Sequence, residues 1–270
     1  MQLIEIPFEK WPQLRDLYQH KKDLSSSYNT LQMCINWIEK DPQLQVKIYT
    51  TSKEWHVDGT FVTEAPITGL LFCNTLKEDF TDLVNTLNHF DNSKMVGGHP
   101  ERLMLAVEKH FLDSGLNKEQ FRSDGGVWQY ISREEALNFN TDLPENITTK
   151  GLDVTHAEQI NRVWPHRFEG SLTFVEHLIK FNKSVGLFEG EQLVAWCLIY
   201  PLGSLGLLQV EESHRRKGLG KLVVKIMSKY LAEQGIEVTA SVVTTNSTSR
   251  SMFKQLGFKI IDTVYWTFKI

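Results

Sequence analysis

The sequence predicts an α/β protein of two domains. Apolar runs of strand length alternate with segments in which apolar residues recur at the spacing of a helix with one buried face. A chain of 270 residues is long enough for two domains of ordinary size. Turn formers dominate residues 139–150, where periodicity is weak, so we expect domains at 1–145 and 146–270.

The first domain alternates predicted helices and strands. Helices are expected over four segments: Trp11–His20, Leu31–Glu39, Asp79–Phe90 and Glu101–Leu112. Strands are expected over four others: Val46–Thr51, Thr60–Glu64, Gly69–Cys73 and Val127–Ile131. No basic Gly-x-Gly turn occurs in this domain. We therefore expect a second α/β unit without a phosphate site of its own.

The second domain begins with a predicted strand, two helices and a hairpin. These elements are expected at Leu152–Val154, His156–Val163, Leu172–Phe181, Val185–Glu189 and Leu193–Tyr200. The last run is apolar on both faces, which indicates a central strand. Further strands are expected at Leu207–Val210, at Glu237–Val243 and from Phe258. A helix is expected after each of the first two, from Gly220 and from Asn246 to Gly257.

A basic turn joins the strand that ends at Val210 to the next helix. Its residues are Arg215, Arg216, Lys217, Gly218, Leu219, Gly220 and Lys221. The first amides of a helix have no partner within the helix, and the helix dipole makes that end partly positive. Glycines let an anion approach the backbone closely, and the cations add charge. The turn is therefore predicted to hold a nucleotide-type pyrophosphate.

The spacing within the turn and one pattern downstream of it narrow the class of ligand. The turn lacks the Gly-Lys-Ser/Thr ending of a P-loop and the third glycine of a dinucleotide-binding fingerprint. Its Arg215-x-x-Gly218-x-Gly220 spacing instead resembles the acyl-CoA signature of the GNAT acyltransferase superfamily. The run from Asn246 through Phe253 to Gly257-Phe258 resembles the superfamily's second motif. The resemblance covers roughly residues 148–270 and implies the GNAT fold there.

One branch is more similar than the rest, the glycine N-acyltransferase-like proteins with an FR47-type C-terminal domain. Asn161-Arg-Val-Trp164-Pro-His and Phe174-Val-Glu-His-Leu-Ile resemble that branch's substrate-side helices. Ala195-Trp196-Cys-Leu-Ile resembles one of its strands. The N-terminal part has the size that the branch requires, and we interpret it as a degenerate GNAT-like half that does not bind CoA.

The resemblance implies an acyl-CoA co-substrate, with acetyl-CoA expected first, and no metal. The residues expected to contact it are Leu208, Gln209, Val210, Arg215, Arg216, Lys217, Gly218, Leu219, Gly220, Lys221, Asn246 and Phe253. The backbone N–H of Val210 is expected to polarise the thioester carbonyl. Asn246 is also expected to cap a helix, and Phe253 to pack.

The general base is not evident. Glycine-conjugating members of the branch carry a glutamate where this chain has Ser204, and a serine hydroxyl does not take an amine proton unaided. This departure argues against glycine conjugation. Substitutes are Glu211, Glu212, His214, His166, Glu169 and His177, or water.

The general acid is equally open. Many GNAT enzymes use a tyrosine where this chain has Phe253, which has no proton to give. Ser249, Ser251, water or direct departure of the CoA thiolate are the alternatives. Cys197 lies in an apolar run without a neighbouring histidine, which favours a buried, inert thiol over a nucleophile.

Composition sets the remaining limits. The chain is 41% hydrophobic and 23% charged with a net charge of −4, which argues against a nucleic-acid module. The three cysteines, Cys34, Cys73 and Cys197, form neither a disulfide framework nor a zinc motif. No signal peptide or membrane-length apolar run is evident. We expect an intracellular soluble protein, cytoplasmic in preference to mitochondrial, that is a monomer or dimer without nucleic-acid or membrane partners.

These observations predict an N-acyltransferase that moves an acyl group directly from acyl-CoA to a primary amine. The expected acceptors are, in falling order, an amino acid such as glycine, another small amine and a protein amino group. The alternative is a CoA-binding pseudoenzyme with a regulatory or scaffold role, in which the phosphate-binding turn is kept and the catalytic groups are lost.

Overall fold

A computed structural model describes residues 1–19, 21, 25–65 and 69–270. The chain divides into two compact units. Unit 1 comprises Met1–Trp128, Val242–Thr245 and Ile261–Ile270, and unit 2 comprises Gln129–Ser241 and Asn246–Ile260. The strands β6 (Phe121–Ile131), β11 (Val238–Val243) and β12 (Lys259–Lys269) contribute residues to both units.

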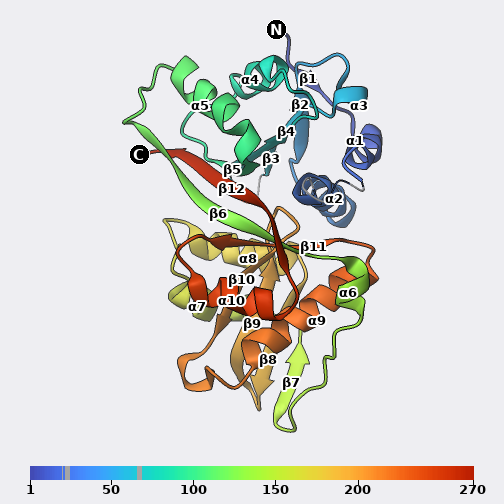
Figure 1. Cartoon of the computed structure of the whole chain (residues 1–270), viewed down its shortest axis with the longest axis vertical. Helices are drawn as coiled ribbons and strands as arrows, with labels where there is room; N and C mark the ends of the chain where they lie inside the picture. The colour runs from blue at the N-terminus through green and yellow to red at the C-terminus, as the bar shows by residue number, and fades with distance from the viewer. Residues whose placement is uncertain (20, 22–24, 66–68) are drawn as a thin grey trace. The chain divides into compact units, whose positions relative to one another are not determined.

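Unit 1 is built on a mixed sheet (Figure 1). Its first strands, in spatial order, are β1 (Ile4–Glu5), β2 (Lys47–Thr50), β3 (Phe61–Ala65), β4 (Leu70–Asn74) and β5 (Val96–Pro100). The later residues of β12 pair with β5, with Tyr265 opposite His99. The β4–β5 pair is parallel, with Leu71 opposite Val96, while β1 to β4 are antiparallel neighbours.

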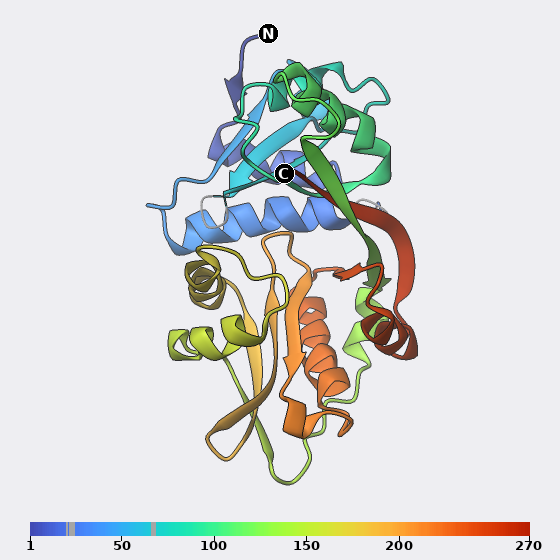
Figure 2. The same ribbon diagram turned by 90° about the vertical axis from the view of Figure 1, so that its left-hand side faces the viewer.

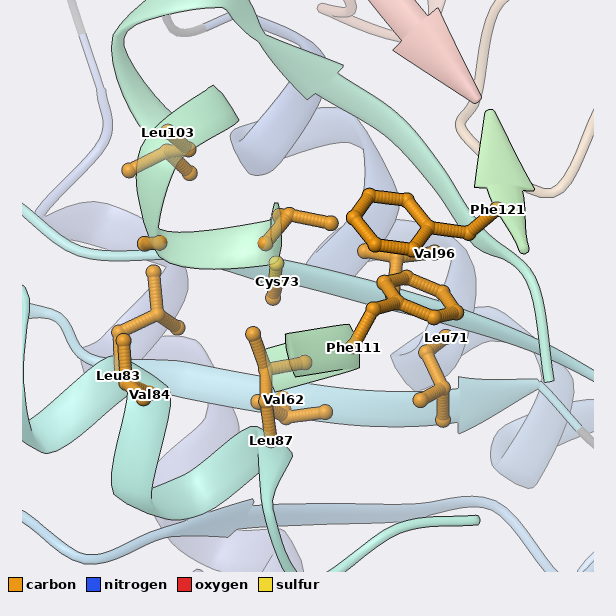
Figure 3. Close-up of a cluster of buried hydrophobic side chains, with 12 residues drawn as sticks. Val62, Leu71, Cys73, Leu83, Val84, Leu87, Val96, Leu103, Phe111 and Phe121 are labelled. Carbon is orange, nitrogen blue, oxygen red and sulfur yellow. The ribbon is translucent and has the colours of Figure 1, made fainter. Parts of the chain in front are cut away.

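The helices of unit 1 lie around this sheet. They are α1 (Trp11–Asp16), α2 (Ser25–Lys40), α3 (Trp55–Asp58), α4 (Thr81–Leu87) and α5 (Met104–Asp113). Figure 3 shows the core that α4 and α5 form against the strands, with Cys73 among the side chains. Phe111 and Phe121 stack there with ring centroids 5.1 Å apart. Burying one such side chain stabilises the fold by about 1.5–3 kcal/mol.

In unit 2, next to the shared strands β12 and β6, the spatial order is β11, β10 (Leu205–Val210), β9 (Gln192–Ile199), β8 (Ser184–Glu189) and β7 (Ile147–Lys150). The helices are α6 (Arg133–Leu137), α7 (Ala157–Val163), α8 (Ser171–Phe181), α9 (Leu219–Glu233) and α10 (Ser247–Gln255). Helices α7 and α8 cover one face of β8 to β10, and α9 covers the other (Figure 2).

The apolar patterns on β9 and α9 explain these positions. All residues of β9 after Gln192 are buried, as expected for a strand covered on both faces. On α9 the buried residues recur at helical spacing: Leu219, Val223, Val224, Met227, Ser228, Leu231 and Ala232. The predicted α/β class is confirmed.

One predicted strand is wrong. Residues Leu152–Val154 are not a strand; the strand is β7, at Ile147–Lys150. Asp153 stops extension there because its side chain accepts a hydrogen bond from the Thr155 amide at 2.9 Å and caps a 3₁₀ helix over Val154–His156. The predicted domain boundary, between residues 145 and 146, falls just before β7 and stays a prediction.

Several element limits also differ. Helix α2 begins at Ser25, earlier than predicted, and α1 ends at Asp16. His20, the predicted end of that first helix, lies outside the described residues. Strand β5 was not predicted, because Gly97 and Gly98 weaken the strand pattern.

Candidate functional site

Strand β10 is irregular at its centre. Gly206 lies opposite Leu198, and Gln209 lies opposite Trp196, so Leu207 and Leu208 face a single residue of β9. This is a β-bulge, and Leu207 has a positive φ of 44°. A positive φ is uncommon for a leucine and is typical of positions where local strain serves a function.

A glycine is required beside the bulge. A Cβ built on Gly206 would lie 1.7 Å from Cδ2 of Tyr200, so the tyrosine ring rests directly on the backbone of β10. Burial raises the pKa of Tyr200, so its phenol stays protonated at neutral pH. The ring thus fixes the backbone on the N-terminal side of the bulge.

The predicted basic turn follows β10 and leads into α9. Gly218 is the N-cap of α9 with φ 83° and ψ −6°, and no side chain caps the helix at this residue. Arg216 also has a positive φ, 63°. Arg215, Arg216 and Lys217 are exposed, and nothing lies within 4 Å of a Cβ built on Gly218. The first amides of a helix of 15 residues therefore face an open, cationic turn.

The other predicted contact residues lie close to this turn. A Cβ on Gly220 would be 3.3 Å from Cγ2 of Val210, so the first turn of α9 lies against the end of β10. The Arg215 side chain donates to the Val210 carbonyl at 3.4 Å. Lys221 donates to Gln255 of α10 at 2.6 Å, which joins the turn to the second motif.

A hydrogen-bonded pair, His214 and Glu189, holds the residue that precedes the turn. His214 is buried, and its Nε2 lies 3.0 Å from Oε2 of Glu189 at the end of β8. Its Nδ1 lies 2.8 Å from the Ser213 hydroxyl. The hydrogen bond to His214 is the main reason that the pKa of Glu189 is lowered. This pair fixes the residue that precedes Arg215, and no local sequence signal identifies it because the partners are 25 residues apart.

The structure does not bring Ser204 to the end of β10 where Val210 lies. Ser204 precedes β10 and Val210 ends it, which at the usual rise per strand residue is a separation of roughly 20 Å. The Ser204 hydroxyl is buried and, among the described residues, has no hydrogen-bond partner. No group is therefore placed there to accept its proton.

Residues of the second motif have structural roles. Asn246 caps α10, with Oδ1 accepting from the Ser249 amide at 3.0 Å. Phe253 is buried, with its ring centroid 4.9 Å from that of Phe258. Ser249 is half-buried in the first turn of α10, and the Ser251 hydroxyl accepts from Gln255 at 3.2 Å.

Of the candidate bases, Glu211 is the one that directly follows Val210. Its carboxylate accepts a hydrogen bond from Nε2 of Gln159 on α7 at 2.7 Å, and the same amide nitrogen donates to the Leu193 carbonyl at 3.0 Å. Glu212 is exposed, as are His166 and Glu169 in the segment between α7 and α8. Gln159 was not predicted, since its partner is 52 residues away in sequence.

His177 and Cys197 are placed differently. The Nδ1 atom of His177 on α8 is buried and has no hydrogen-bond partner within the described part of the chain. Burial raises the pKa of the Cys197 thiol to about 12, and the thiol contacts backbone carbonyls of Leu198 and Gly206. It is a thiol rather than a thiolate at neutral pH, which supports the inert reading over the nucleophilic one.

A small apolar cavity of about 20 Å³ lies beside the bulge. Its walls include Trp164 and Pro165 at the end of α7, Trp196 of β9, and Leu207 to Gln209 of β10. The Trp164 ring stacks on Phe174 at 5.7 Å and lies 6.0 Å from Phe168. The sequence motif around Trp164 did not predict this cavity, because its walls come from three separate elements.

Among the described residues, no three or more His, Cys, Asp or Glu side chains are arranged to hold a metal ion. Within the same ranges, every helix is too short or too polar to cross a membrane.

Parts of the chain are similar in sequence to known proteins. Residues 184–267 match the family model described as FR47-like protein. Human glycine N-acyltransferase-like protein 1 is 28% identical over 169 residues, which is 62% of this chain and 54% of that protein. The alignment thus spans about half the length of this curated relative.

Solved structures show the same fold over nearly the whole chain. A Drosophila protein matches with a TM-score of 0.85 at 23% identity, covering 99% of this chain and 98% of that one. A tandem GNAT protein from the clavulanic acid biosynthesis pathway matches with a TM-score of 0.56 at 12% identity, covering 99% and 98%.

Proposed function

Because the chain has the GNAT acyltransferase fold and carries an FR47-type domain over residues 184–267, we propose that unit 2 binds an acyl-CoA and transfers its acyl group directly to a primary amine. The observation that carries the proposal is the uncapped, cationic N-terminus of α9, placed immediately after a bulged strand. Such a turn suits a pyrophosphate, and a bulge leaves backbone amides free for a carbonyl.

The residues fit the co-substrate in two places. Arg215 to Lys221 would hold the phosphates, with Gly218 leaving room for them at the backbone. The end of β10, at Leu208 to Val210, would lie along the pantetheine arm, and the Val210 N–H would donate to the thioester oxygen. Asn246 and Phe253 would line the arm from α10 while they cap and pack that helix.

The reaction requires the amine to lose a proton and the CoA sulfur to leave. The amine nitrogen attacks the thioester carbon, and the carbon–sulfur bond breaks to release CoA as a thiolate. We assign the amine proton, through water, to Glu211, because its carboxylate is held by Gln159 next to Val210. Ser249 is proposed to relay a proton from solvent water to the thiolate, since Phe253 has none to give. Ser204 fits the base role poorly because its hydroxyl lacks an acceptor within the described residues.

The acceptor is proposed to be a small primary amine. The name of the human relative refers to glycine, which keeps glycine among the candidates. Other small amines and a protein amino group follow. A panel of amines assayed for release of free CoA thiol would rank them.

A second reading is a CoA-binding pseudoenzyme. The buried Ser204 hydroxyl and the proton-less ring of Phe253 favour it, because both stand where related enzymes carry ionisable groups. Binding of CoA without thiol release from any acyl-CoA and amine pair would support this reading over catalysis.

Unit 1 is proposed to be a degenerate GNAT-like half without a CoA site. Between β4 and α4 the chain reads Thr75-Leu-Lys-Glu-Asp-Phe80, with acidic residues and no glycine. Arg102 donates to Oδ1 of Asn74 at 2.8 Å and also to the Thr75 carbonyl, so its guanidinium occupies the end of β4. Titration calorimetry should then give one CoA per chain, and two would contradict the proposal.

Thermal unfolding with CoA and acetyl-CoA tests the central claim. A ligand at one hundred times its dissociation constant stabilises the folded state by about 2.7 kcal/mol. Gly218→Glu should abolish the shift, because a carboxylate would stand in the phosphate site. Gly170→Glu is the matched control: Gly170 caps α8 with φ 85° and ψ −1°, and nothing lies within 4 Å of its Cβ position.

A retained shift in the control and its loss in Gly218→Glu is the expected result. A folded wild type that shifts with none of these ligands would end the proposal, as would an equal loss in both variants.

A further inference from the structure

The small cavity beside the β10 bulge lies against the strand along which the proposed pantetheine arm would run. The phosphate-binding turn stands at the C-terminal end of β10. Among the described residues, β10 pairs with β11 at Leu205 and Ala240, at the other end of β10. Between Leu205 and the turn, β10 is not paired with β11. An extended pantetheine arm therefore has a path from the turn toward Leu207 and Leu208, which line the cavity.

The size and lining of the cavity restrict what can enter it. A volume of about 20 Å³ has room for one water-sized group. Its walls are apolar except for Gln209. A methyl group matches both the size and the polarity, whereas a longer chain would have to displace a wall.

Trp164 is the lining residue whose position is fixed by the end of α7. Pro165 follows it and Trp164 has ψ 118°, so the helix ends there. Its ring is held by stacking on Phe174, with centroids 5.7 Å apart and planes 29° apart. Trp196, which also lines the cavity, is 1% exposed and belongs to the core of unit 2.

From these contacts we propose that Trp164 is a specificity residue that limits the acyl donor to a two-carbon chain. The inference rests on the proposed acyl-CoA site. It adds that the chain-length limit is built into one side chain rather than into the strand backbone.

The test compares the affinities of CoA, acetyl-CoA, butyryl-CoA and hexanoyl-CoA by titration calorimetry, which needs no acceptor. Wild type should bind acetyl-CoA at least as well as CoA and hexanoyl-CoA about tenfold more weakly or worse, since one methylene too many in an apolar pocket costs about tenfold or more. Trp164→Ala should remove this discrimination while its affinity for CoA itself stays unchanged. Trp164→Phe should give an intermediate ratio and covers the case in which the alanine variant does not fold.

Phe168→Ala is the control for a general loosening of the aromatic cluster. Phe168 touches Trp164 but does not line the cavity, and it is 55% exposed. Its chain-length ranking should equal that of wild type. The inference is overturned if Phe168→Ala changes the ranking as much as Trp164→Ala, or if wild type prefers hexanoyl-CoA. Binding of every acyl-CoA with an unchanged ranking in Trp164→Ala would overturn the inference and leave the proposed function standing, whereas no binding of any of them would remove both.

Discussion

At the scale of single residues, this site depends on backbone positions and on pairs that hold them. Leu207 and Gly218 adopt positive φ angles at the two ends of the proposed arm site. Glu189 and Gln159 are not part of the turn, but each holds a residue that precedes it, His214 and Glu211 respectively, through a hydrogen bond. The proposed chemistry therefore depends on positioned backbone amides, on the Glu211 carboxylate and on the Ser249 hydroxyl.

Glu211→Gln tests that carboxylate. The amide keeps the size of the side chain and can still accept from Gln159, but it does not take a proton. We expect kcat for thiol release to fall by about a hundredfold, the lower end of general-base effects, with the affinity for CoA unchanged. Gln159→Ala should give a smaller loss of kcat. Full activity of Glu211→Gln against every amine tested would show that water alone removes the proton.

At the scale of secondary-structure elements, caps and close contacts decide where helices and strands begin and bend. Asn246 begins α10 by accepting from Ser249, and Asp153 begins the 3₁₀ helix that displaced a predicted strand. The bulge in β10 stands against Tyr200, whose ring needs a glycine beneath it. Each of these effects is local, and each sets the direction of a longer element.

Loss of the α10 cap should have a modest cost. Asn246→Ala removes the acceptor for the Ser249 amide and should lower the free energy of unfolding by about 1 kcal/mol. Asn246→Asp keeps an acceptor and should restore it. Denaturant titration of the three proteins measures both effects, and an aspartate variant as unstable as the alanine variant would argue against a capping role.

Gly206→Ala should be more damaging than an ordinary surface substitution. The new methyl would meet the Tyr200 ring at 1.7 Å, so the ring or the bulged strand must move. Overpacking of this kind typically costs about 1–3 kcal/mol. The double variant with Tyr200→Ala should recover part of that loss of stability because the ring is gone. No change in the unfolding midpoint for Gly206→Ala alone would show that β10 is not constrained there.

At the scale of the whole molecule, the chain forms two α/β units that share three strands, and the two histidines whose pKa is lowered by burial lie in unit 1. Burial lowers the pKa of both His99 and His110 there from 6.5 to about 4. His99 lies on β5, where its Nε2 is 2.8 Å from the Thr267 hydroxyl. Both histidines are neutral in the folded state above that pKa.

The stability of unit 1 should therefore fall as the solution becomes more acidic. Between pH 6.5 and about 4 the unfolded chain binds protons that the folded chain does not, so stability is complete above pH 6.5 and declines toward pH 4. Each histidine contributes a slope of about 1.4 kcal/mol per pH unit. Denaturant unfolding between pH 4.5 and 7.5 should show a flatter profile for His99→Gln than for wild type or for the exposed control His89→Gln. Parallel profiles for all three would refute this assignment.

The comparison of predicted and observed elements separates local from long-range information. The α/β class, the start of α9 at a basic glycine turn, the cap at Asn246 and most strands could be read from neighbouring residues, because caps, turns and apolar periodicity act over a few positions. Predictions failed where a short polar signal competed with an apolar run, as at Leu152–Val154, or where glycines hid a strand, as at β5.

The sequence by itself determined the basic, glycine-containing turn after β10 and the helices and strands on either side of it. Only the tertiary structure decided the bulge at Leu207, the pairing of Gln159 with Glu211, the support of His214 by Glu189 and the cavity beneath Trp164. The physical reason is distance along the chain. Glu189 and His214 are 25 residues apart, Gln159 and Glu211 are 52 residues apart, and the cavity has walls from three elements, so these groups meet only through packing. Residue spacing along the chain encodes the conformation of a turn, whereas the contacts across a sheet follow from how all its strands and helices fit together.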